Sequence, residues 1–315
     1  MKKEQKHMTS IGGQAVIEGV MMRGPLGVAV AVRKPDGEIV VDKSLSAPKA
    51  QTNKFFKLPV IRGVVNFISS MVLGVKALTF SADFVDLEED DPNYKPSKFE
   101  TFLENKLGDK IKDVVIYFSV FLALIMGVGL FILLPTFIAS FLNRFHMHDV
   151  VKTLIEGIIR ILIFLIYIVS VSQMKDIKRV FEYHGAEHKT IFAYESGEEL
   201  TPENVRKYSR LHPRCGTNFL LIVMIVSIVI FSFLSWSNVW LRMLSRLALL
   251  PVVAGVSYEI IKWTGRRQSG LCAIICKPGL WLQLLTTREP DDSQLEVAIA
   301  ALKNVKTENK EDDRW

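Results

Sequence analysis

Two histidines four positions apart have the clearest metal-binding potential in this sequence. His184 and His188 lie in the segment YHGAEHK at 183–189. Residues four apart on a helix share one face, with Cβ atoms roughly 6 Å apart, so both imidazoles can reach one tetrahedral cation. Glu187 gives the inverted order of the metalloprotease helix signature, in which the neighbouring carboxylate acts as general base. The alternative is a polar helix that carries two solvated histidines by chance.

A second segment, HPRC at 212–215, adds two further ligand types after 23 intervening residues. A connection of that length can fold back and bring His212 and Cys215 to the first pair. Imidazole and thiolate ligands suit zinc or another borderline divalent ion, whereas calcium and magnesium prefer oxygen. We therefore expect a divalent metal, zinc, at His184, His188, His212 and Cys215. Alternatively, Cys215 packs as a small apolar residue and His212 caps a helix.

Two acids and two arginines are further candidates. Glu18, in a glycine-rich N-terminal segment, is a candidate catalytic group, ligand or proton carrier. Glu259, near the end of a predicted span, is a candidate ligand or proton carrier because ionisable groups inside membranes are functional by default. Its alternatives are a pair with Lys262 or snorkelling to the interface. Arg23 and Arg214 are candidate contacts for an anionic substrate or lipid phosphate, and simple inner-leaflet contact is an equal alternative.

Two other pairs receive a structural interpretation. Cys272 and Cys276 have only apolar residues between them, so packing is favoured over a second thiol site. Glu156 and Arg160, four apart, are predicted to form an intrahelical ion pair. Arg242 and Arg246 are expected either to snorkel to the interface or to pair with these two residues.

The elements that must position these residues are membrane spans. The chain has 315 residues, of which 49% are hydrophobic, and a positive mean hydropathy of +0.25. Residues 114–142 carry no Asp, Glu, Lys or Arg, and this run exceeds the ~20 residues that cross a bilayer. The predicted spans are 114–142, 150–173, 218–236 and 239–261.

The distribution of basic residues predicts which side each connection occupies. Residues 1–113 hold 17 Lys and Arg, residues 173–217 hold eight, and the tail from Lys262 holds nine. The short connections at 143–152 and 236–242 hold three together. The positive-inside rule then predicts four crossings, with both termini and the middle loop in the cytoplasm. The first 15 residues are basic and polar, so no cleaved signal is expected, and no basic stripe with groove-reading elements indicates nucleic-acid binding.

Soluble segments are expected between and beyond the spans. Residues 1–57 should form a cytosolic glycine-rich element with a β-hairpin, because Pro35-Asp36-Gly37 separates two β-rich runs. Residues 58–113 should contain an interfacial helix over 58–80, an acidic linker and a polar helix, although a fifth span at 58–80 stays open. Residues 174–217 form the metal-site loop, and residues 262–315 form a cytosolic tail with amphipathic helices, one opening at Pro290. The predicted fold is thus an α-helical integral membrane protein of about four transmembrane helices with a small α/β cytosolic element, built from the hairpin, the middle loop and the tail helix.

Four motifs resemble a known family. They are GGQAVIEGVMMR at 12–23, YHGAEHK at 183–189, HPRCGT at 212–217 and LLTTREPDD at 284–292. Together they resemble the YqhQ-type bacterial membrane proteins, a domain of unknown function (1385) described as a predicted metal-dependent enzyme. The resemblance implies a multi-pass protein of a Gram-positive-type bacterial plasma membrane with a cytosolic metal site, and it implies no substrate.

The function that we expect is a metal-dependent membrane hydrolase. The metal would lower the pKa of its bound water, and Glu187 would take the proton as an ester, amide or phosphoryl group is attacked. The partners would be membrane lipids, and the substrate a lipid or membrane peptide at the inner leaflet. One alternative is a metal-stabilised scaffold or partner-binding subunit without catalysis. Another is an ion or solute carrier, which is less favoured because the spans are few and lack a polar path.

Overall fold

The computed structural model describes residues 7–43, 56, 58–84, 111–145, 147–234, 238–265, 270–307, 309 and 311–314. The chain divides into two compact units. Unit 1 comprises residues 1–85, 165–230 and 248–315, and unit 2 comprises residues 86–164 and 231–247. The predicted acidic linker and most of the predicted polar helix fall at 85–110, outside the described residues.

Unit 1 contains a four-stranded antiparallel sheet in the order β1-β2-β3-β4. Its strands are β1 (Gly12–Val16), β2 (Gly19–Gly24), β3 (Gly27–Arg33) and β4 (Ile39–Asp42). The predicted hairpin is confirmed as β3–β4, with Gly37 at φ 89° in its turn. The glycine-rich segment before it adds two strands that were not predicted, because glycine is depleted in strands and obscured the alternation.

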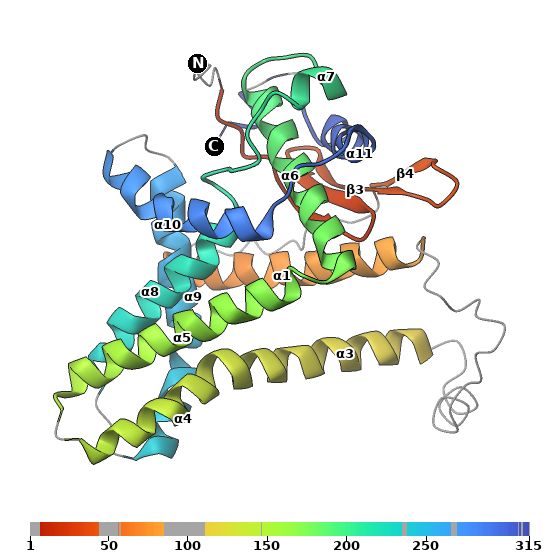
Figure 1. Cartoon of the computed structure of the whole chain (residues 1–315). Helices are drawn as coiled ribbons and strands as arrows, with labels where there is room; N and C mark the ends of the chain where they lie inside the picture. Colours follow the sequence, from red (N-terminus) through yellow and green to blue (C-terminus); the bar gives the residue numbers. More distant parts are fainter. Residues whose placement is uncertain are drawn as a thin grey trace. The chain divides into compact units, whose positions relative to one another are not determined.

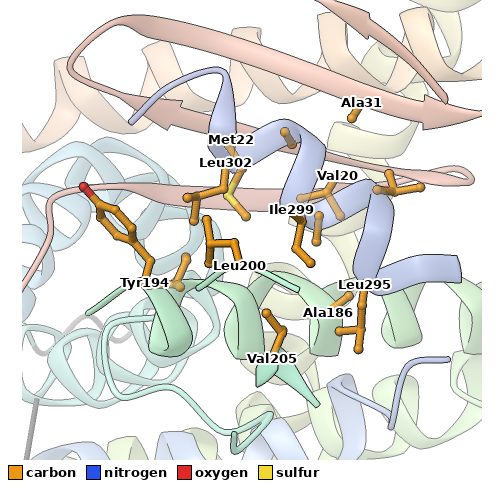
Figure 2. Close-up of a cluster of buried hydrophobic side chains, with 14 of the residues drawn as sticks. Val20, Met22, Ala31, Ala186, Tyr194, Leu200, Val205, Leu295, Ile299 and Leu302 are labelled. Carbon is orange, nitrogen blue, oxygen red and sulfur yellow. The ribbon is translucent and has the colours of Figure 1, made fainter. Parts of the chain in front are cut away.

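Helices α6 (Lys175–Glu195) and α11 (Asp292–Lys303) cover one face of the sheet (Figure 1). Strand residues alternate between faces, so Val20 and Met22 of β2 enter this core. In Figure 2, Ala186 of α6 and Ile299 of α11 belong to the same cluster. The short helix α7 (Pro202–Val205) contributes Val205. The histidine segment, predicted to lie in a loop, therefore belongs to a helix at the centre of this sheet-and-helix core.

Helix α11 begins where the sequence predicted a new helix. Asp291 Oδ1 accepts a hydrogen bond from the Gln294 backbone N–H, and Gln294 Oε1 accepts one from the Asp291 backbone N–H, which completes a capping box. The predicted apolar stripe is buried, from Leu295 to Leu302.

The other face of the sheet packs against α1 (Ile61–Ala82). The buried cluster there contains Leu73 and Ala77 of α1, with Phe80 and Phe84 packed against it. Its sheet residues are Val16, Met21, Val28, Val30 and Val32.

Four helical stretches among the described residues are long and apolar enough to cross a membrane: Ile61–Ala82, Val114–Ser140, Asp149–Val171 and Val239–Gly265. The first is α1, the third α5 and the fourth α9. The second joins α3 (Ile111–Val128), the π-helical turn η3 (Gly129–Leu133) and α4 (Leu134–Ser140). This is the architecture of an α-helical membrane protein.

Two shorter apolar helices complete the set. They are α8 (Gly216–Ser232) and α10 (Gly270–Thr286), each of 17 residues. The long apolar helices thus differ from the predicted spans in two places. Helix α1, for which a fifth span was left open, has 22 residues, whereas α8, the predicted third span, has 17. Helix α8 ends at Ser232, four residues before the predicted boundary, and residues 235–237 lie outside the described part.

A charged cluster is buried in unit 2. Glu156 and Arg160 lie one turn apart on α5, and the Arg160 guanidinium donates to Glu156 Oε1 at 3.1 Å. Arg246 of α9 pairs with the same carboxylate, and Thr136 of α4 donates to it at 2.9 Å. Each of these side chains belongs to a residue at most 6% exposed. The predicted ion pair is therefore confirmed, with Arg246 as its third member.

Candidate metal and catalytic site

Backbone carbonyls orient both histidine rings on α6. His184 Nδ1 lies 2.8 Å from the carbonyl oxygen of Thr286, and His188 Nδ1 lies 2.6 Å from that of Arg210. A carbonyl can only accept, so each Nδ1 carries a hydrogen. In the neutral form of each ring, Nε2 then holds the free lone pair. This is the arrangement in which protein histidines usually bind metals.

Cys215, which directly precedes α8, joins the two histidines. Its Sγ lies 3.2 Å from His184 Nε2. One ligand atom from each of His184, His188 and Cys215 lies within 4.8 Å of the other two. His188 is 1% exposed, and its Nε2 has no hydrogen-bond partner among the described residues. The structure thus brings together three of the four predicted ligands.

The fourth predicted ligand, His212, is held differently. Its backbone N–H donates to Gln283 Oε1 and its carbonyl accepts from Gln283 Nε2, both at 2.8 Å. The Arg214 N–H donates to His212 Nδ1 at 3.3 Å, and His212 Nε2 lies 3.8 Å from Glu195 Oε2. The ring packs beside His188, with centroids 5.6 Å apart. His212 therefore lines the site, with its Nε2 directed at a carboxylate.

Glu187 connects the site to the sheet. It is 5% exposed, and its Oε1 accepts a hydrogen bond from the Gly13 backbone N–H at 2.9 Å. A Cβ built on Gly13 would lie 2.5 Å from the Met21 carbonyl oxygen and 3.1 Å from the Glu187 carboxyl carbon. Strand β1 can lie this close to both the β2 backbone and the Glu187 side chain only because residue 13 is glycine.

We expect Gly13→Ala to destabilise unit 1 by about 1–3 kcal/mol, since backbone cannot move aside as a side-chain tip can. Gly12→Ala is the matched control, because nothing lies within 4 Å of a Cβ at Gly12. Thermal unfolding of both variants in detergent checks this. Equal midpoints for the two would show that the approach of β1 to α6 is not constrained.

The thiol and imidazoles shift each other's protonation. Burial alone would lower the pKa of His184, but the neighbouring Cys215 raises it to about 9. Burial alone would raise the pKa of Cys215, but His184 and His188 bring it well below its usual value. The two imidazoles therefore favour the thiolate of Cys215, the form that binds metals and attacks electrophiles. Burial raises the pKa of Glu187.

Glu195, two turns beyond His188 on α6, contacts His212 and Arg214 beside the site. Burial would raise its pKa, but His212 and the paired Arg214 lower it, so Glu195 is ionised. Burial lowers the pKa of His212 to about 4, which keeps that ring neutral. Glu195 Oε1 also accepts from the Thr9 N–H at 2.8 Å.

A buried acid near the C-terminus extends this network. Asp313 is fully buried and accepts hydrogen bonds from Thr9 at 2.9 Å and Tyr194 at 2.6 Å. Sequence reasoning missed Glu195, Gln283 and Asp313. Helical spacing from His188 was a usable signal for Glu195, whereas Asp313 lies in a charged tail with no periodicity to mark it.

Two other predicted acids lie in ion pairs. Glu18, at φ 50° in the turn between β1 and β2, pairs with Arg179 and accepts from the Tyr183 hydroxyl at 3.2 Å. Glu259 pairs with Arg62 of α1, whose Nε donates to it at 2.6 Å. Neither acid belongs to the group of ligand atoms formed by the two histidines and Cys215.

Arg23 and Arg214, the two predicted anion contacts, lie in different surroundings. Arg214 pairs with Glu195, whereas Arg23 lies opposite Gly12 in the sheet and forms no ion pair with any described residue. A surface groove between α7 and α11 is lined by Pro202, Ile299 and Lys303 among others, and by none of the candidate residues.

Comparisons with known proteins agree on one family. A family model described as "Protein of unknown function (DUF1385)" matches residues 58–308. The uncharacterized protein YqhQ of Bacillus subtilis (strain 168) is 37% identical over 293 residues, which cover 91% of this chain and 89% of that protein. No solved structure matches. The family expected from the motifs is confirmed, and neither description names an activity.

Proposed function

The chain belongs to the DUF1385 family of proteins of unknown function, and we propose that it binds one zinc-like divalent ion and catalyses a hydrolysis at the membrane surface. The observation that carries the proposal is the convergence of ligand atoms from His184, His188 and Cys215 within 4.8 Å. Three protein ligands with a carboxylate beside them are the usual composition of a catalytic zinc site, which keeps one position open.

The donor set fits the metal in chemistry and nearly in spacing. Zinc bonds of about 2.0–2.3 Å put the ligand atoms of a tetrahedral site about 3.3–3.7 Å apart. His184 Nε2 and Cys215 Sγ are already 3.2 Å apart, and the remaining pairs of ligand atoms lie within 4.8 Å. Side-chain rotations that move these atoms by about 1 Å would bring them to the spacing of a zinc site. The unpartnered Nε2 of buried His188 is hard to explain without a ligand, because buried polar atoms are normally satisfied.

The chain's own residues divide the remaining work. A bound divalent ion supplies Lewis-acid activation of water or of a substrate oxygen. Glu187, adjacent in sequence to His188 and held by the Gly13 N–H, is placed to accept a proton. Oε1 of this carboxylate accepts the backbone hydrogen bond, and Oε2 is the atom that would accept the proton. The carbonyls of Thr286 and Arg210 keep both rings in the metal-binding tautomer.

The substrate class follows from the position of the ligands along the chain. Cys215 directly precedes the apolar helix α8, and Thr286 is the last residue of apolar α10. The site thus lies where apolar helices meet the soluble core. A lipid or membrane peptide with an ester, amide or phosphoryl bond fits this location better than a freely soluble metabolite.

Glu187→Gln separates catalysis from metal binding. We expect the variant to retain about one metal ion per chain and to lose about 10²–10⁴-fold in hydrolysis rate. Metal is measured by elemental analysis of detergent-purified protein, and hydrolysis with ester, amide and phosphodiester probes in liposomes. If the wild type holds metal, hydrolyses no probe and melts at a lower temperature after chelation, the metal-stabilised scaffold replaces the hydrolase.

A second candidate function uses the thiol as a nucleophile. Cys215 Sγ beside His184 Nε2, with His184 Nδ1 oriented by a carbonyl, matches the nucleophile, base and orienting group of cysteine hydrolases. This candidate predicts activity that survives a chelator and is abolished by iodoacetamide at Cys215. The metal hydrolase predicts the reverse order of sensitivity, with bound metal protecting Cys215 from alkylation.

A further inference from the structure

We infer that α1 does not cross the membrane but lies along its surface, held between the sheet and the acyl chains of the leaflet beneath it. The inference is independent of any bound metal. It concerns a helix whose length and apolar composition would by themselves permit a crossing.

The first argument counts the membrane crossings between the sheet and α6, which must be even in number if both lie on one side. The sheet, α6 and α11 share one hydrophobic core, so they lie on one side of the membrane. Between the sheet and α6 the chain passes through α1, the α3–α4 stretch and α5. The last two are the most apolar of the three, and we take them as one pair of crossings. Residues 85–110 are rich in charged residues, which excludes a further span there. A crossing by α1 would leave α6 on the wrong side.

The second argument is one of length. From Leu73 onwards α1 packs on the sheet, and Gly74 lies so close that a Cβ there would meet the Gln14 side chain at 2.5 Å. An open sheet with exposed edges is not tolerated in hydrocarbon, so this half of α1 lies outside the bilayer core. Residues 61–72 extend only about 18 Å at about 1.5 Å per residue, against about 30 Å of hydrocarbon.

The third argument identifies what covers the opposite side of α1. The side chains turned away from the sheet are apolar and open, with Ile68 50%, Met71 37%, Val72 41% and Leu78 38% exposed. The other exposed residues of α1 are Phe67, Ser70 and Lys76, and a lysine can extend its ammonium to the membrane interface. A wide apolar face of this kind is stable against a protein core or against lipid. Within the part of the chain that the structure describes, each of these four apolar side chains keeps more than a third of its surface open.

The first turns of α1 lie against α8 and α9. Gly63 packs against Gly255 and Tyr258 of α9, and Asn66 donates to the Tyr258 hydroxyl at 2.8 Å. Phe67 stacks on Phe219, in the first turn of α8, with ring centroids 5.6 Å apart. Helix α1 therefore starts where one span ends and another begins, at membrane-surface level.

The number of crossings between α6 and α11 must also be even. Helices α8, α9 and α10 lie between α6 and α11, so α9 needs one partner crossing. Helix α8 is uncharged, whereas α10 contains Lys277 and Pro278. The four crossings are therefore α3–α4, α5, α8 and α9, and both α1 and α10 border the soluble core.

Cysteine labelling of the full-length protein tests the topology. Asp83→Cys reports the end of α1, Glu203→Cys the soluble core, and His148→Cys the connection between α4 and α5, all exposed positions. A membrane-impermeant maleimide mass tag is applied to intact spheroplasts and to opened membranes, with wild type giving the count for the three native cysteines. We expect Asp83→Cys and Glu203→Cys to label from one side, and His148→Cys from the other. Labelling of Asp83→Cys from the same side as His148→Cys would overturn the inference.

A spin label tests the lipid contact. In liposomes, a nitroxide at Val72→Cys should collide several-fold more with oxygen than with a water-soluble nickel chelate, as in acyl chains. A nitroxide at Glu203→Cys should show the opposite ratio. A Val72 label that matches the Glu203 label, or is shielded from both reagents, means that water or another protein covers α1 and sinks the proposal.

Discussion

Replacing both His184 and His188 with alanine should reduce the metal content of the purified chain from about one equivalent to nearly none. The two rings supply two of the three ligand atoms that converge, and Cys215 alone cannot hold a divalent ion against solvent. The His212 ring cannot substitute for them without giving up its contact with Glu195. Elemental analysis after purification without chelators measures the effect.

The control for this variant is His148→Ala, since His148 is exposed between α4 and α5. It should leave the metal content unchanged. Circular dichroism of the double variant must retain the helical signal, because both histidines also anchor backbone carbonyls of other segments. Equal metal content in the double variant and the wild type would remove the metal site, and with it the hydrolase, while leaving the topology of α1 untouched.

Local patterns predicted much of this fold. A strongly apolar run of sufficient length has no alternative to a membrane or a core, so the spans predicted at 114–142 and 150–173 correspond to α3–α4 and α5. The hairpin turn at Gly37 and the cap at Asp291 depend on residues within three positions of each other. The i, i+4 spacing of His184 and His188 likewise fixes their common face once α6 forms.

The parts that escaped prediction depend on contacts between distant residues. Whether His212 points at the metal cluster or at Glu195 is decided by Gln283, some 70 residues later, which fixes its backbone. The glycine at position 13 is explained by Glu187, 174 residues later, whose carboxylate accepts a hydrogen bond from the Gly13 backbone N–H. Composition could not separate a crossing α1 from a surface helix, because the difference depends on what the sheet covers.

Replacing Glu156 with alanine is expected to be the most destabilising single change in unit 2, at about 3–5 kcal/mol. The carboxylate of Glu156 pairs with both Arg160 and Arg246, and all three residues are at most 6% exposed. Its removal leaves two guanidiniums facing each other without the carboxylate, in a bundle that water does not reach. The cation–π contacts of both arginines with Phe231, at 5.4 and 5.2 Å, cannot offset this loss.

A surface ion pair on the same helix provides the control. Asp149 lies 3.7 Å from Lys152 at the start of α5, and the Asp149 side chain is 58% exposed, so Asp149→Asn should change stability by less than about 1 kcal/mol. Both variants are compared by thermal unfolding in one detergent. The decisive comparison adds Arg246→Met to Glu156→Ala. If burial of unpaired charge is the cause, removing one guanidinium recovers part of the loss, whereas a defect of shape alone would make the double variant worse.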